Sequence, residues 1–155
     1  VAVYLKSLPA VAEVGDAPYA YDADAEVALG NMNFDEPGSA TYYNYCLSFH
    51  QYDGSGHGDH MPPLAGNPIV LDPDASSLIN LTLNGSLRVI AEGRPEHYDM
   101  PYFRSSLDDE QIADVISYIR KSWGNNASTV SEADVTGLRN ATDPTMNDVV
   151  VLRMK

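Results

Sequence analysis

The sequence predicts a mostly α-helical fold, and three stretches support this prediction. The clearest covers residues 107–123, where apolar side chains recur at helical spacing on one face: Ile112, Val115, Ile116 and Ile119. Residues 38–50 form a second helical pattern, and a shorter helix is expected at residues 74–83. Between these stretches, segments rich in glycine and proline predict loops.

The N-terminal part is expected to contain one helix end and a long linker. Residues 1–9 resemble the last turns of a helix that Pro9 stops, and they are too few to be stable without a surface to pack against. Residues 10–37 are rich in Ala, Asp, Glu, Gly and Pro, and no helical or strand period persists in them. We therefore interpret them as a linker that follows a surface.

The helix at residues 38–50 brings a cysteine and a histidine close together. Ser39 is its expected N-cap, and Tyr42 and Cys46 stand four positions apart, so they share one face. His50 follows Cys46 after another four positions. Residues 51–66 hold glycines, two prolines and two histidines, which is typical of a loop.

The second half of the chain alternates helix with irregular segments. Asp74 or Ser76 is the expected N-cap of the helix at residues 74–83, and residues 84–102 show no regular pattern. Ser106 and Asp109 resemble a capping box at the start of the last clear helix. The tail, residues 126–155, is polar until a short apolar run, Val149 to Leu152, which predicts a strand or a strip laid against another surface.

Charge and cysteine content exclude several classes of protein. The net charge is −13 over 155 residues, which argues against binding to nucleic-acid backbones and favours basic partners. No segment is long and apolar enough to span a bilayer. Cys46 is the single cysteine, so an internal disulfide is excluded.

Cys46 and His50 together suit covalent haem attachment. Such a haem needs a thiol that adds to a vinyl group and an imidazole beneath the iron, and a helix end places both on one side of the ring. The usual attachment motif is Cys-x-x-Cys-His, and the shorter pattern here occurs often by chance. Met100 stands fifty residues further on and offers a thioether for the other face of the iron. A carbonyl from the turn at residues 61–66 is a suitable acceptor for the Nδ1 proton of His50.

Four motifs in order carry a family resemblance. They are Gly-x-x-x-Tyr-x-x-x-Cys-x-x-x-His, then Pro-Pro-Leu-Ala-Gly-Asn, then Met-Pro-x-Phe, then Leu-Asp-Asp-Glu-Gln-Ile-Ala-Asp-Val-Ile-Ser-Tyr-Ile-Arg. Residues 38–125 therefore resemble a class I c-type cytochrome. More narrowly, they resemble the C-terminal haem domain of the multi-haem cytochrome c subunits of bacterial membrane-associated dehydrogenases.

The resemblance implies a set of roles around one haem c. His50 would be the proximal iron ligand and Met100 the distal ligand, Cys46 would form the thioether, and the Pro62 carbonyl would hold His50. It also implies a cytochrome c fold in which the helix at residues 38–50 crosses the one at residues 107–123, with Gly38 permitting their close approach. The residues outside 38–125 then form the linker and the tail.

Phe49 is the departure from the family pattern. The family has a second cysteine at this position, so we expect a haem held by one thioether at Cys46. Phe49 would then pack on the vinyl group that stays unattached.

The same resemblance implies single-electron transfer with no catalysed reaction of the chain's own. Electrons would come from a partner dehydrogenase subunit or an adjacent haem and pass to a respiratory acceptor. The expected location is the periplasm, with membrane association only through partners. Residues 1–9 are then expected to be the end of an upstream haem domain in a longer polypeptide, the alternative being a helix that packs on this domain.

Other ligand sets remain open. Cys46, His50, His57 and His60 are one thiol and three imidazoles within fifteen residues, a set that suits zinc or copper. Loss of the second cysteine would also fit a haem-free cytochrome fold kept for protein interaction. Met61 is too near His50 in sequence to reach the far face of a haem easily. His57, His60 and His97 are expected to be solvated loop residues, and a bis-histidine haem is the remaining possibility.

Overall fold

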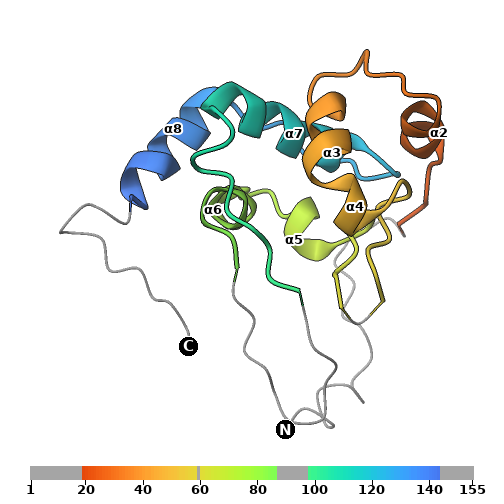
Figure 1. Cartoon of the computed structure of the whole chain (residues 1–155), viewed down its shortest axis with the longest axis horizontal. Helices are drawn as coiled ribbons and strands as arrows, with labels where there is room; N and C mark the ends of the chain where they lie inside the picture. Colours follow the sequence, from red (N-terminus) through yellow and green to blue (C-terminus); the bar gives the residue numbers. More distant parts are fainter. Residues whose placement is uncertain (1–18, 59, 87–97, 144–155) are drawn as a thin grey trace, which may run out of the picture.

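The computed structural model describes residues 19–58, 60–86 and 98–143 (Figure 1). Its helices follow in the order α2 (Asp24–Gly30), α3 (Ser39–Tyr45), α4 (Leu47–His50), α5 (Pro68–Leu71), α6 (Ser76–Asn84), α7 (Asp109–Lys121) and α8 (Glu132–Ala141). Within the described ranges there is no strand, and isolated bridges join His57 to Met61 and Ser86 to Met100. The predicted mostly α fold is confirmed. Nor does any helix among these residues have the length and apolar character to cross a membrane.

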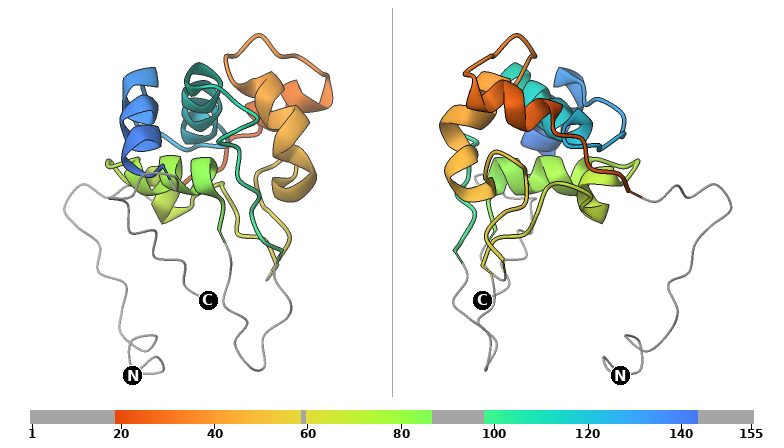
Figure 2. Two further views of the ribbon diagram at one scale, coloured as in Figure 1. Left: turned by 60° about the vertical axis from the view of Figure 1, so that its left-hand side comes forward. Right: turned by 90° about the vertical axis from the view of Figure 1, so that its right-hand side faces the viewer.

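Helix α7 lies at the centre of the fold and contacts α3, α5, α6 and α8 (Figures 1 and 2). The predicted apolar stripe is buried: Ile112, Val115, Ile116 and Ile119 are each at most 7% exposed. The same core includes Leu29 from α2, Tyr42 from α3 and Val135 from α8. Burial of this stripe is the main reason that α7 forms, since a helix of this length is only marginally stable alone.

Gly38 permits the close crossing of α3 and α7, as predicted. It has φ of +83°, and a Cβ atom there would lie 2.2 Å from the carbonyl oxygen of Asp114. Ser39 is not the N-cap that the sequence suggested. Gly38 holds that position, and the Ser39 hydroxyl donates to the Glu36 carbonyl at 2.5 Å. Glycine is therefore required here for both backbone conformation and space.

The predicted helix at residues 38–50 is divided at Cys46, which ends α3 and precedes α4. Cys46 has φ of −116°, yet its N–H still donates to Tyr42 O at 2.8 Å. His50 N–H donates to Cys46 O at 2.9 Å. The thiol and the imidazole therefore remain one helical turn apart despite the break.

The capping box of α7 lies two residues after the predicted one. Asp108 accepts from the Gln111 N–H at 2.8 Å, and Gln111 Oε1 accepts from the Asp108 N–H at 3.1 Å. Ser106 instead belongs to the preceding turn, where its N–H donates to Phe103 O. Leu107 is 4% exposed, so its burial fixes where the chain enters the helix.

Two helices fall in segments that the sequence analysis interpreted as irregular. Helix α2 lies in the expected linker at residues 10–37, and α8 lies in the expected tail at residues 126–155. Helix α8 begins with a Ser131–Asp134 capping box and contacts both α6 and α7. Helices α2 and α8 are both short and bury few apolar residues, so hydrophobic periodicity alone was too weak to reveal them. The helix end at residues 1–9 and the run at residues 149–152 lie outside the described residues.

Candidate haem site

His50 lies at the end of α4 with its ring turned to the following turn. Its Nδ1 atom is 3.3 Å from the carbonyl oxygen of Pro62. A neutral imidazole that donates from Nδ1 keeps Nε2 as the lone-pair nitrogen, so Nε2 is the atom available to a metal. Burial lowers the pKa of His50 and outweighs the opposing hydrogen bond to Pro62. The neutral, metal-binding form of the ring is therefore favoured.

The turn that carries Pro62 is built around two glycines. Gly54 O accepts from the N–H groups of Leu64 and Ala65, at 2.7 and 3.1 Å. Gly56 has φ of +69°, and a Cβ atom there would lie 2.5 Å from Met61 O and 2.6 Å from Pro62 O. The sequence predicted a loop here whose carbonyl accepts from His50, but not the part that Gly54 and Gly56 play in its shape. The structure shows that the glycines let the turn fold back so that Pro62 reaches His50.

Aromatic residues of the core pack against the turn that follows His50. The Tyr42 hydroxyl donates to Gln51 O at 2.7 Å, and Trp123 Nε1 donates to Tyr52 O at 2.9 Å. The rings of Tyr42 and Trp123 lie 5.2 Å apart. A Cβ atom at Gly54 would lie 2.7 Å from the Trp123 ring. The position of His50 is therefore set by a packed core as well as by its own helix.

Met100 comes from a separate segment that crosses the C-terminal end of α6. Met100 and Ser86 exchange backbone hydrogen bonds of 3.1 and 3.2 Å, and Phe103 N–H donates to Thr82 O at 3.1 Å. Gly85 has φ of +69°, and a Cβ atom there would lie 2.5 Å from Met100 O. Met100 is half-buried and packs against the core.

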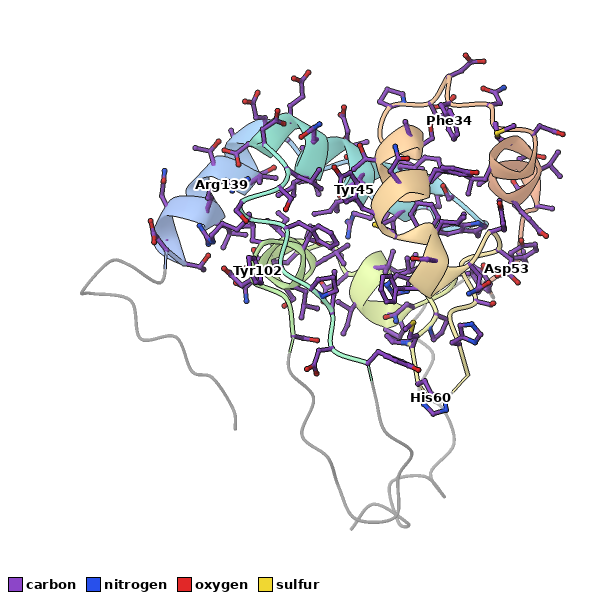
Figure 3. All side chains as sticks on the ribbon, viewed as in Figure 1. Phe34, Tyr45, Asp53, His60, Tyr102 and Arg139 are labelled. Carbon is purple, nitrogen blue, oxygen red and sulfur yellow. The ribbon has the colours of Figure 1, made fainter. Side chains whose placement is uncertain are left out.

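The helical turn of Cys46 and His50 and the segment that carries Met100 meet on one side of the molecule. The rings of Tyr45, one residue before Cys46, and Phe103, three residues after Met100, stand edge to face at 5.9 Å. Further along, the rings of His60 and Tyr98 lie 6.3 Å apart. Figures 1 and 2 show the segment from residue 98 running beside the 57–61 turn, and Figure 3 shows His60 at the tip of that turn. Sequence analysis did not predict either ring pair, because no short spacing signals it.

Cys46 is half-buried at the break between α3 and α4 and is a free thiol. Burial raises its pKa to about 12, so it is protonated at neutral pH. Phe49 is also half-buried, and its N–H donates to Cys46 O at 3.0 Å. The two side chains thus come from one helical turn, next to His50.

The zinc or copper alternative finds no support in the described ranges. There, no three His, Cys, Asp or Glu side chains lie together as a metal ion would require. His57 and His60 are exposed, whereas Met61 is 8% exposed and hydrogen-bonds through its backbone to His57. His97 lies outside the described residues.

The donor set on this side of the molecule fits a c-type haem. A protonated thiol and a neutral imidazole come from one helical turn, and a thioether comes from a segment that packs against the same turn through Tyr45 and Phe103. Imidazole and thioether are the axial pair of cytochromes c. The soft, uncharged character of these groups suits haem iron better than it suits a hard cation.

Comparison with known proteins identifies the family of this chain. The family model described as cytochrome c matches residues 36–123. The chain is 41% identical over 146 residues to the cytochrome c subunit of the quinone alcohol dehydrogenase of Gluconacetobacter polyoxogenes, a match that covers 93% of this chain and 31% of that relative. It is 36% identical over 141 residues to the gluconate 2-dehydrogenase cytochrome c subunit of Pantoea cypripedii, with 90% and 32% covered.

A shorter relative extends the comparison. Cytochrome c-552 of Thermus thermophilus is 30% identical over 105 residues, which cover 65% of this chain and 70% of that protein. The chain spans about a third of the length of the dehydrogenase subunits it matches. The family match covers more than half of the chain and includes both Cys46 and Met100. This chain belongs to the cytochrome c family.

Proposed function

We propose that this chain is the haem domain through which a dehydrogenase passes single electrons toward a respiratory acceptor. As a member of the cytochrome c family, the chain holds a covalently bound haem c and transfers electrons through it. The observation that carries the proposal is the meeting of the Cys46–His50 turn with the Met100 segment through Tyr45 and Phe103.

In this proposal His50 is the proximal iron ligand and Met100 is the distal ligand. The contact from His50 Nδ1 to Pro62 O supports the first role, because it orients the ring and leaves Nε2 for iron. The backbone pairing of Met100 with Ser86 supports the second, because it fixes the segment that presents the thioether. When bound, the haem supplies reversible one-electron chemistry, and a methionine–histidine pair favours a high potential.

We further propose that one thioether, from Cys46, attaches the haem. Phe49 occupies the position one turn from Cys46 and next to His50, so its ring is placed to pack on the vinyl group that stays unattached. The protein's own contribution to electron transfer is then positional. Its core residues hold both ligands still and keep water from the site, so little rearrangement accompanies a change in charge.

The partner in this proposal is the catalytic subunit of a dehydrogenase, and the named relatives are the support for it. Those subunits are about three times as long as the matched region, so further haem domains in the same polypeptide are part of the proposal. We place the protein in the periplasm, with membrane association only through partners. The intact mass of the natural protein tests this: a mass near that of 155 residues plus one haem would contradict a multi-haem subunit.

Optical spectroscopy tests the proposed cofactor against both alternatives. The reduced protein is expected to show the sharp Soret and split visible bands of a low-spin haem c. A spectrum without visible bands would indicate a haem-free interaction domain or a zinc site. A thiolate-to-copper charge-transfer band would indicate a copper site.

A further inference from the structure

We propose that α8 is a brace for the segment that carries Met100, with Arg104 and Arg139 as positioning residues. Helix α8 lies beyond the residues that the cytochrome c family model matches. In Figure 1 it lies beside α7, and Figure 3 shows Arg139 on this helix. The inference rests on the proposed role of Met100 as the distal ligand.

Arg139 of α8 hydrogen-bonds to the stretch of chain between Met100 and the start of α7. Its Nη1 donates to the carbonyl of Arg104, its Nη2 donates to Leu107 O at 3.0 Å, and its Nε donates to the carboxylate of Asp109. All three acceptors lie within nine residues after Met100. One side chain of α8 therefore holds the end of the distal segment and the start of α7 at the same time.

Arg104 makes the reciprocal contacts. Its Nη1 donates to Arg139 O at 2.8 Å, and its Nη2 donates to Thr142 O at 3.2 Å and to Thr142 Oγ1 at 2.7 Å. Its Nε donates to Asn84 Oδ1 at 3.0 Å, and Asn84 Nδ2 donates to the same Thr142 hydroxyl at 3.0 Å. The two arginines thus cross-link α8, the end of α6 and the distal segment.

These contacts are partly shielded from solvent, which distinguishes them from a fully exposed surface ion pair. The side chains of Arg139 and Asp109 are 21% and 17% exposed. Burial is the main cause that lowers the pKa of Arg104, followed by the charge of Arg139. Removal of either guanidinium would leave several carbonyl groups without donors, and such a loss costs more than the loss of an exposed pair.

The brace reaches Met100 through a short stretch of backbone. Arg104 N–H donates to Leu83 O and Phe103 N–H donates to Thr82 O, each at 3.1 Å, and Met100 pairs with Ser86. The segment is thus held on α6 along one edge and on α8 at its end. Only four positions separate Met100 from Arg104, so a loosened end gives the thioether more freedom to leave the iron.

The test uses the haem-loaded ferric protein and follows its weak near-infrared sulfur-to-iron band as the pH is raised. The half-loss pH is the pH at which half of the protein has lost this band. Replacing Arg139 with Gln (Arg139→Gln) should raise the fraction of protein without the band about tenfold, so that the pH of half-loss falls by about one unit. Thr142→Val removes one acceptor of Arg104 and should shift the half-loss pH in the same direction, by less. The midpoint potential should fall in both variants.

Two matched controls separate positioning from general stability. Lys121→Gln removes the same charge from an exposed site on α7 and should leave the half-loss pH unchanged. Thr136→Val removes the 2.6 Å hydrogen bond from α8 to Asp109 and leaves the hydrogen bonds of Arg104 and Arg139 in place, so it should lower the midpoint of unfolding and leave the half-loss pH almost unchanged.

The outcomes distinguish this inference from the proposed function. A wild-type protein without the band would overturn the assignment of Met100 as ligand and, with it, the brace. A wild-type band whose half-loss pH and potential stay unchanged in both Arg139→Gln and Thr142→Val would overturn the brace alone. A half-loss pH that merely follows the unfolding midpoint across all variants would also overturn it.

Discussion

The proximal and distal halves of the site are held in different ways. On the proximal side, Cys46, His50 and Pro62 lie within seventeen residues, and the bond from His50 to Pro62 spans twelve positions. On the distal side, Arg104 of the Met100 segment is fixed by residues twenty to thirty-eight positions away. The hydrogen bond that orients the imidazole is therefore local, although Trp123 also packs against its turn, whereas the thioether segment is anchored to both α6 and α8.

The two halves of the site should fail at different stages as the fold is destabilised. The hydrogen bond from His50 to Pro62 re-forms whenever the helix and its turn re-form, so the imidazole should keep its orientation when the contacts of α6 and α8 loosen. The distal half needs α6, α7 and α8 to stay docked together. We therefore expect loss of the Met100 ligand to precede loss of His50 as the protein is destabilised.

The largest effect is expected for Cys46→Ala. Since Cys46 is the single cysteine, this variant has no thiol left to form a thioether. Acid–organic extraction should remove all haem from the variant and none from the wild type. Ser48→Ala, an exposed change on the same helix, is the control and should keep the haem attached. Haem that stays with the Cys46→Ala protein after extraction would show that another group holds it.

Met100→Ala should break the distal half without detaching the haem. The near-infrared band should vanish, and the midpoint potential should fall by on the order of 100 mV, which is roughly a fiftyfold change in the preference for the reduced iron. Protein-film voltammetry measures the potential. Met61→Ala is the matched comparison, and a band that disappears in that variant instead would make Met61 the ligand.

Gly56→Ala should damage the proximal turn. A Cβ atom at Gly56 meets the carbonyl oxygens of Met61 and Pro62, whereas one at Gly58 meets nothing within 4 Å, and both glycines have positive φ. The backbone strain is therefore similar, and the clash alone should cost Gly56→Ala about 2 kcal/mol more than Gly58→Ala. Urea unfolding measures the difference, and equal losses would mean that the turn adapts.

The smallest effect is expected for Asp109→Asn, in the dependence of the unfolding free energy on acidic pH. Burial opposes ionisation of Asp109, but hydrogen bonds from Thr136 and Arg139 outweigh it and hold its pKa below the usual value. The ionised carboxylate therefore stabilises the fold above its ordinary pKa of about 4, and this contribution is lost as pH falls through the lowered value. Asp109→Asn should flatten the fall in unfolding free energy below pH 4. An unchanged slope would mean that other carboxylates dominate.

The contrast between the halves also explains what the sequence could predict. The spacing of Cys46 and His50 and the stripe of α7 are short-range patterns, so they could be read directly. The close approach at Gly38 followed from the family resemblance. The first two features have a physical cause that lies within one or two helical turns, whereas the approach of Gly38 to Asp114 is a contact between distant helices.

The features that the sequence did not reveal depend on residues far apart in the chain. The Tyr45–Phe103 ring pair and the exchange between Arg104 and Arg139 leave no periodic signal. Helix α8 has a Ser131–Asp134 capping box that a local search would find, but its interior buries only Val135 completely. Its docking on α6 and α7, rather than its own propensity, makes it a helix.

The most direct test of the whole account is the pyridine haemochrome spectrum of the wild-type protein after acid–organic extraction. The haem is expected to stay with the protein, and its α band is expected to lie to the red of a two-thioether haem c, because one vinyl group remains beside Phe49. Complete transfer of haem to the organic phase, or a band at the two-thioether position, would contradict attachment through Cys46 alone.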